Sequence, residues 1–479
     1  MRSLRMKRLM SFVLMILLVI GLCACGGETV SEEPETTAGL QVGFGRANIT
    51  PKEPVWISGG GNPNRISTSF IDYLYVTCVA ITDPSGNTYL IFTQDLQGTR
   101  ESYTGPAKKT ISQETGVPVE NMMISSTHTH SAPGLTNASR TGIPAAIKIY
   151  SEGMLQAARD AMADRSPATV SVGCTQAEDY VFVRHYILDN GTYAGANYGD
   201  FNKSTIRDHA YKANTTLQMI RFTRLAEGKK DILMMNLGAH ATFNGSTSLT
   251  NLSADFPGPL RDHIEANSDL LVAYFISAAG DQAPDSRIAS EVVAKDYREY
   301  GKGVGQLVLD ALPTLTEVKS GDFKFTTESF TMTTNKTGMD RLQEATETYN
   351  AYLEGGYPLS DPLVAKYGFV RVFEARAIVQ RSTLADTYTF DVWAMSMGDV
   401  SFVFAPYEMF GKNAAQITEE SPFSMTFIAT CANDGHGYIP AEDAYEFNCY
   451  EAYSSKAAPG HGEKLAQLYV EMLNDLKGA

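Results

Sequence analysis

Apolar residues along this chain fall into short runs, which alternate with segments where apolar positions recur every three or four residues. Short apolar runs bounded by turn-forming residues predict strands, whereas the longer spacing predicts helices. Strands are expected at 121–127, 168–174, 231–240, 270–277 and 424–430, hairpins at 73–96 and 387–408, and helices at 103–115, 147–164, 290–311 and 462–476. Because strands alternate with helices and no repeat interrupts residues 41–479, we predict one layered α/β domain with a mixed central β-sheet flanked by helices.

Chemically useful side chains follow the ends of these apolar strands. In "MMISSTHTHSAPG" (122–134), His128 and His130 end one strand, where alternation would point both side chains to the same face. The other strands are followed by His240, Asp281, Glu408, His436 and Tyr438. Junctions between strands and loops are where α/β sheets bind ligands, so we expect the functional site there.

Two imidazoles, a carboxylate and a fourth oxygen donor would make a catalytic zinc site with room for water. Bound zinc lowers the pKa of water from about 16 to about 7, which provides hydroxide at neutral pH. Two hydrogen-bonded histidines in a wet cleft would give the same pattern, and the residues alone leave both interpretations open. The chain has no HExxH, no GxSxG, no P-loop and no dinucleotide-binding fingerprint, which argues against those enzyme classes.

The first 25 residues differ from the rest in composition. The basic segment "MRSLRMKR" precedes the apolar segment "LMSFVLMILLVIGL", which is the order of an export signal. "LCAC" (22–25) resembles the lipobox of bacterial lipoproteins, which implies a signal peptide at 1–24 and a lipid on Cys25. An uncleaved membrane anchor is the alternative, and both place the protein outside the cytoplasmic membrane. Residues 25–40 are polar and acidic, and we expect a flexible tether there.

Overall composition is that of a globular protein, with 43% hydrophobic and 19% charged residues. The formal net charge of -15 disfavours nucleic acid as a partner. Beyond the anchor the cysteines are widely spaced, which fits neither a zinc knuckle nor a disulfide framework. They are Cys78, Cys174, Cys431 and Cys449. A Cys431–Cys449 bridge and buried free thiols are both open interpretations.

Several segments together resemble a known family. They occur in the order "GFGRANITP" (43–51), "THTHSAPG" (127–134), "VRHYILDNG" (183–191), "NLGAHAT" (236–242), "GDVSFVFAPYE" (398–408) and "GYIPAEDAYEFNCYE" (437–451). The set resembles the catalytic domain of the neutral/alkaline (non-lysosomal) ceramidase family, from about residue 41 to 476. That resemblance implies hydrolysis of the amide of ceramide, with one zinc ion per chain. A lipid or small N-acyl amide would then be the substrate.

The resemblance also implies roles for individual residues. The zinc ligands would be His128, His240, Glu408 and Tyr438. Facing the scissile amide, His130 and Tyr450 would donate hydrogen bonds to the oxyanion, and Arg184 would contact the polar group of the substrate. Zinc-activated water would attack the amide carbonyl, and a neighbouring acid would protonate the leaving amine. Asp95 and Asp281 are the two candidates for that acid.

This chain departs from the family pattern at two places. In "GDQAPD", Ala283 stands where the family has a serine and Asp285 where it has an asparagine, so a serine nucleophile is excluded there. We also expect no C-terminal immunoglobulin-like domain. Three hypotheses follow: a surface-anchored zinc amidase for ceramide or a related N-acylated amphiphile, a zinc hydrolase for a different amide or ester, and a non-catalytic binding lipoprotein.

Overall fold

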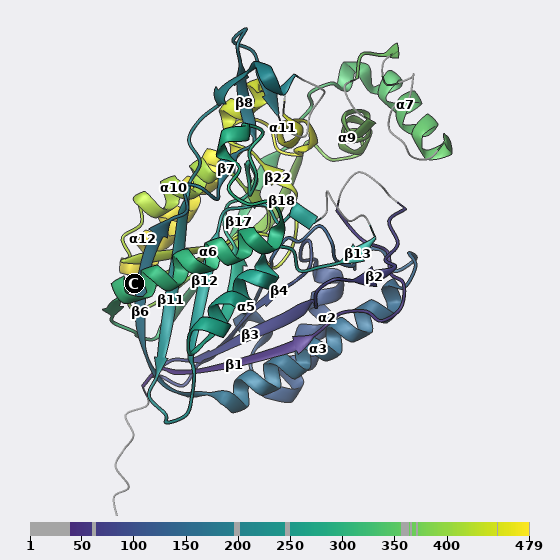
Figure 1. Ribbon diagram of the computed structural model, residues 1–479. Coiled ribbons are helices and arrows are strands. Elements are labelled where there is room, and N and C mark those ends of the chain that lie inside the picture. The colour runs from purple at the N-terminus through teal and green to yellow at the C-terminus, as the bar shows by residue number, and fades with distance from the viewer. Residues whose placement is uncertain are drawn as a thin grey trace, which may run out of the picture. The chain divides into compact units, whose positions relative to one another are not determined.

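The structure is a computed structural model, and element labels follow Figure 1. It describes residues 39–59, 64–195, 202–244, 250–355, 364, 366–369, 372–447 and 449–478. These residues belong to one compact unit. The predicted signal peptide, Cys25 and nearly all of the predicted tether lie outside the described residues. Within them, no helix combines the length and the apolar composition needed to cross a membrane.

The larger sheet is mixed and has nine strands among the described residues, in the order β14-β12-β11-β6-β1-β3-β4-β5 with β16 beside β6. Its strands are β1 (Gln41–Asn48), β3 (Tyr75–Thr82), β4 (Thr88–Gln94), β5 (Met122–Ser126), β6 (Ser166–Gln176), β11 (Thr216–Arg224), β12 (Asp231–Leu237), β14 (Leu270–Ile276) and β16 (Thr316–Val318). The β4–β5 and β12–β14 pairs are parallel. Strands β1 and β6 pair at only two positions, so a short pairing joins the two halves of the sheet.

A second sheet has the order β17-β18-β19-β21, with β19 and β21 parallel. Its strands are β17 (Phe323–Thr333), β18 (Thr387–Met397), β19 (Val400–Phe404) and β21 (Met425–Ala429). Side chains from both halves of the larger sheet meet this sheet in one apolar cluster, which includes Val79, Ile220, Met395 and Phe427. Burial of this inner layer holds the two sheets together.

Helices cover the outer faces of the sheets. They are α2 (Glu101–Thr115) and α3 (Ile143–Asp164), α5 (Pro257–Asn267) and α6 (Tyr297–Ala311), and α10 (Gly411–Glu419) and α12 (His461–Gly478). The first pair packs on β1, β3 and β4, the second on β11, β12 and β14, and the third on the second sheet (Figure 1). Helices α7 (Leu342–Gly355) and α9 (Val372–Ser382) share a small apolar cluster of their own.

The "GFGRAN" segment has a structural reason for its glycines. A Cβ atom on Gly43 or Gly45 would lie 2.1 Å from the main-chain oxygen of Ala161 or Ala157, respectively. Both positions therefore need glycine, because α3 lies directly against β1.

The fold class expected from the sequence is confirmed as a mixed α/β architecture with helix-covered sheets. Some boundaries differ: the helix expected from residue 147 begins at Ile143, and the strand expected to end at 240 ends at Leu237. The helix expected from residue 290 begins at Tyr297, where the Asp296 carboxylate accepts hydrogen bonds from two main-chain N–H groups of the first turn. All four described cysteines are free, so Cys431 and Cys449 are separate buried thiols.

Candidate metal centre

Three histidines come from two loops that follow strands. Strand β5 ends at Ser126, so His128 and His130 lie beyond it, and His240 lies beyond β12. His128 has a φ of 65°, a left-handed conformation that non-glycine residues seldom adopt and that concentrates at functional sites. The expected convergence of His128 and His130 is confirmed. Its expected cause is wrong, because the side chains meet through this tight turn and not through strand alternation.

Main-chain carbonyls orient two of the imidazoles. The Nδ1 atom of His128 bonds to the carbonyl of Gln97, and Nδ1 of His240 lies 2.9 Å from the carbonyl oxygen of Ala279. A carbonyl oxygen only accepts, so each Nδ1 carries the proton and donates. In the neutral ring, which is the form that binds a metal, each Nε2 atom is then the lone-pair nitrogen, the usual arrangement in metal-ligating histidines.

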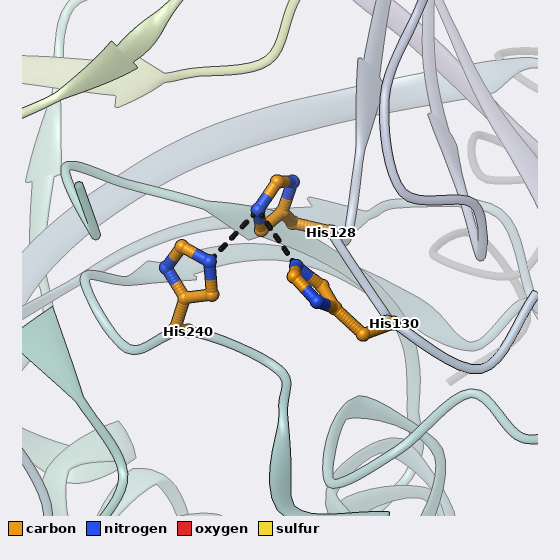
Figure 2. Close-up of side chains that lie close together, drawn as sticks. All are labelled: His128, His130 and His240. Carbon is orange, nitrogen blue, oxygen red and sulfur yellow. Dashed lines mark hydrogen bonds between the residues drawn. The ribbon is translucent and has the colours of Figure 1, made fainter. Parts of the chain in front are cut away.

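The ring nitrogens point toward one another (Figure 2). Nε2 of His128 lies 3.0 Å from Nε2 of His240 and 3.2 Å from Nε2 of His130. All three rings approach edge to face. His128 and His240 are buried, and His130 is half-buried.

A carboxylate and a phenol join the cluster through a short two-stranded pairing. Strands β20 (Glu408–Met409) and β22 (Tyr438–Ile439) run parallel, with Glu408 opposite Tyr438. The Glu408 Oε2 atom lies 3.3 Å from Nε2 of His128 and 3.7 Å from Nε2 of His240. The Tyr438 ring stacks on His240 with centroids 6.5 Å apart. The four ligands implied by the sequence resemblance are therefore brought together.

This donor set fits a divalent metal ion. Ligands about 2.1 Å from a tetrahedral ion lie roughly 3.4 Å apart, which matches the spacings between His128, His240 and Glu408. The buried Oε2 atom of Glu408 has no hydrogen-bond partner among the described residues, and a cation would satisfy it. His130 is also near enough to offer a ligand nitrogen.

Burial and neighbouring charges shift the pKa values of the three imidazoles in different directions. Burial alone would lower the pKa of His128, but Cys431 and Glu408 outweigh it and raise that pKa well above its usual value. Burial, with the charges of His128 and Arg184, lowers the pKa of His130 and of His240 well below theirs. At neutral pH the metal-free cluster therefore holds a proton on His128.

Metal binding should consequently release at least one proton, because a metal binds only the neutral imidazole. We expect the metal dissociation constant to fall about tenfold per pH unit between about pH 6 and pH 8. Chelator competition across this range measures it. A dissociation constant that does not change with pH would contradict the assignment of His128 as a ligand.

Two further predicted residues border the cluster. Tyr450 is the first residue of α11 (Tyr450–Ser454), and its ring lies 5.6 Å from that of Tyr438. The Arg184 guanidinium is buried, and its Nη2 atom lies 3.2 Å from the Tyr438 hydroxyl. Burial raises the pKa of both tyrosines, so each hydroxyl keeps its proton in the metal-free site and can donate it.

Two predicted carboxylates lie in other hydrogen-bond networks. Asp95 accepts two hydrogen bonds from the Arg261 guanidinium, at 2.9 and 2.7 Å. Asp281 accepts from the Tyr211 hydroxyl at 2.7 Å and from the main-chain N–H of Gly411 at 2.8 Å, at the start of α10. Asp281 adjoins the site through its main chain, because its carbonyl accepts from the N–H of Arg184.

The remaining residues singled out in the sequence lie beside the cluster or apart from it. Ala283 is buried in β15 (Gln282–Ala283), which pairs with β7 (Phe182–Val183), and it offers no hydroxyl. Asp285 is half-buried in the loop that follows. His436 stacks on Phe390 at 4.3 Å between ring centroids and is not one of the clustered histidines.

A second buried group escaped the sequence analysis. His185, Cys449 and Glu451 place their ligand-type atoms within 4.8 Å of one another. Cys431 was also missed as a neighbour, and its sulfur lies 3.5 Å from Nδ1 of His128. For the buried group, the sequence offered one signal. His185 lies in "VRHY" beside Arg184, and Cys449 and Glu451 lie in "NCYE" on either side of Tyr450.

The fold is shared with solved ceramidases. Neutral ceramidase from Pseudomonas aeruginosa matches with a TM-score of 0.68 and 17% sequence identity, over 92% of this chain and 75% of that one. A ceramidase complexed with C2 matches with a TM-score of 0.66 and 16% identity, over 92% and 76%. No protein-family model matches the sequence, and no curated protein does. At these identities the likeness shows the fold alone.

Proposed function

We propose that this chain is a zinc-dependent amide hydrolase that cleaves the N-acyl bond of ceramide or a related N-acylated amphiphile. The observation that supports this proposal most directly is that Nε2 of His128, Nε2 of His240 and Oε2 of Glu408 lie within 3.0–3.7 Å of one another. The Tyr438 ring stacks on His240 beside them. The shared fold of two solved ceramidases supports the same substrate class.

The metal would be held by His128, His240, Glu408 and Tyr438. Zinc bound there would polarise the amide carbonyl and supply a nucleophilic oxygen at neutral pH. The carbonyls of Gln97 and Ala279 keep the two ligand imidazoles in the tautomer that offers Nε2. These donors come from two loops and from the paired strands β20 and β22, so segments distant in the sequence must fold together to form the site.

Three side chains would act on the substrate amide. His130 and Tyr450 would donate hydrogen bonds to the amide oxygen as it gains negative charge, and each such donor commonly contributes about 3 kcal/mol. Arg184 would hold the Tyr438 hydroxyl and, as the sequence resemblance implies, contact the polar group of the substrate. Most of these groups are buried, which strengthens each interaction because water does not screen it.

The leaving amine needs a proton, and Asp281 is the better placed of the two candidate acids. Burial raises the pKa of Asp281, which favours its protonated form, and its main chain adjoins Arg184. Asp95 is held by Arg261 at both carboxylate oxygens, so its side chain is committed to a buried ion pair.

Ala283 supports a second candidate function, a zinc hydrolase for a different amide or ester. The matching family position carries a serine, so this position offers one hydroxyl fewer. A non-catalytic binding lipoprotein remains the third hypothesis. For all three we propose a bacterial protein outside the cytoplasmic membrane, attached by a lipid on Cys25.

A substrate series tests these functions. We expect the full-length protein in detergent to hydrolyse N-acyl sphingosines, and to lose this activity with a zinc chelator and recover it with added zinc. Release of the amine is measured for acyl chains from two to sixteen carbons and for matched N-acyl amino acids. Turnover of the amino-acid series alone would favour the second candidate, and no turnover of either with zinc bound would favour the third.

A further inference from the structure

A second buried cluster lies next to the candidate metal centre. It consists of His185, Cys449 and Glu451, whose side chains are almost completely buried. His185 begins strand β8 (His185–Leu188), and the other two lie at the start of α11. The cluster therefore ties two distant parts of the sequence together behind the site.

Glu451 contacts two basic side chains, His185 within this cluster and Arg184 beside it. Its Oε1 atom lies 2.6 Å from Nη2 of Arg184, and its Oε2 atom lies 2.9 Å from Nε2 of His185. The Arg184 and Glu451 side chains are 5% and 2% exposed, so water does not screen their attraction. The carboxylate is held from both sides and cannot move without breaking one contact.

Arg184 carries this constraint to the metal centre. The nitrogen that faces Glu451 also lies 2.6 Å from the carbonyl oxygen of Gly280 and 3.2 Å from the Tyr438 hydroxyl. An arginine side chain has about 2 kcal/mol of rotamer entropy to lose when it is fixed in one place. The buried ion pair with Glu451 offsets that cost and selects the rotamer that reaches Tyr438.

We propose that Glu451 is a positioning residue of the metal centre, acting through Arg184 to hold the Tyr438 hydroxyl in place for the metal. The proposal rests on the proposed function only through the assignment of Tyr438 as a ligand. A second metal site at His185, Cys449 and Glu451 is the competing interpretation. The Arg184 guanidinium opposes it, because a cation bound to Glu451 would lie next to another positive charge.

A double-mutant cycle on zinc affinity tests the proposal. Zinc dissociation constants are measured by chelator competition on the full-length protein in detergent, for the unmodified chain, Glu451→Gln, Tyr438→Phe and the double variant. Loss of a residue that supports a ligand typically weakens metal binding about 10–100-fold, and we expect this for Glu451→Gln. In the Tyr438→Phe background the same change should weaken binding by no more than about twofold.

Matched variants separate positioning from general destabilisation. Glu265→Gln also breaks a glutamate–arginine pair, with Arg46 at 2.8 Å, and should leave zinc affinity unchanged. If Glu451→Gln does not fold, Arg184→Lys replaces it in the cycle, since lysine lacks the rigid planar guanidinium whose Nη2 atom contacts both Glu451 and Tyr438.

Four outcomes would overturn this proposal alone. They are an unchanged affinity in Glu451→Gln, an equal loss with and without the Tyr438 hydroxyl, an equal loss in Glu265→Gln, and two zinc ions per chain falling to one in Cys449→Ser. An unmodified protein that binds no zinc overturns both this proposal and the metal centre. Normal zinc binding without amide hydrolysis overturns the proposed function alone.

Discussion

Replacing His240 with alanine should empty the metal centre and abolish amide hydrolysis. The Nε2 atom of His240 is buried and lies 3.0 Å from Nε2 of His128 and 3.7 Å from Oε2 of Glu408, so alanine removes a ligand that water cannot replace with the same geometry. A bound metal contributes several kcal/mol of transition-state stabilisation, which corresponds to a loss of at least about 10³-fold in kcat/KM. Metal content by mass spectrometry should fall from about one zinc per chain to almost none.

His436→Ala is the matched control. This histidine lies in a neighbouring loop but stacks on Phe390, so its loss should leave the zinc content unchanged. Burial lowers the pKa of His436 to about 4, which makes it a neutral ring at physiological pH, as a metal ligand would be. A His240→Ala protein that retained its zinc would show that the ligand assignment is wrong.

Replacing Asp95 with alanine should lower the free energy of unfolding by about 3–5 kcal/mol. The change leaves the Arg261 guanidinium buried without its counter-charge, and breaking one side of a buried ion pair has this cost. Urea unfolding monitored by circular dichroism measures it. The double variant Asp95→Leu/Arg261→Met removes both charges and should recover most of the loss.

The same experiment distinguishes the two roles considered for Asp95. A structural carboxylate predicts a large loss of stability that the double variant restores. If Asp95 is instead the general acid, the Asp95→Asn variant should lose kcat while its free energy of unfolding stays unchanged. Stability retained in Asp95→Ala would contradict the structural role.

The strands and their hairpins could be predicted from sequence because buried strands consist of continuous runs of apolar residues. Strands β12 and β14 are buried almost throughout, and the hairpin of β18 and β19 turns at Gly398, whose φ of 63° favours glycine. Helix α5 was missed because it begins with Pro-Gly-Pro (257–259), which resembles a turn although proline is well tolerated in the first helical turn.

Strand β17 was missed for the opposite reason. Its sequence, "FKFTTESFTMT", is mostly polar, and most of its residues are exposed or half-buried. Eleven residues pair with β18, so main-chain hydrogen bonding holds it in the sheet with little apolar burial of its own. A pattern method that relies on burial gives little signal for such an edge strand.

Without the family resemblance, which named four ligands, the residues alone predicted the candidate ligands only as a set of residue types at strand ends. Which of them meet depends on how strands distant in the sequence pair and on the left-handed turn at His128, and local spacing reveals neither. The contact of Glu451 with Arg184 could not be predicted for the same reason, because the two residues lie far apart in the sequence. Asp95 shows a further ambiguity of sequence patterns, because a carboxylate at a strand end is as useful for an ion pair as for catalysis.

The most direct test is a crystal structure of the full-length protein grown with zinc, with diffraction recorded on both sides of the zinc absorption edge. We expect one anomalous peak about 2.0–2.2 Å from Nε2 of His128, Nε2 of His240 and an oxygen of Glu408, with the Tyr438 hydroxyl completing the coordination. A map with no peak among these four side chains, or with zinc bound elsewhere, would contradict the metal centre and the hydrolase built on it.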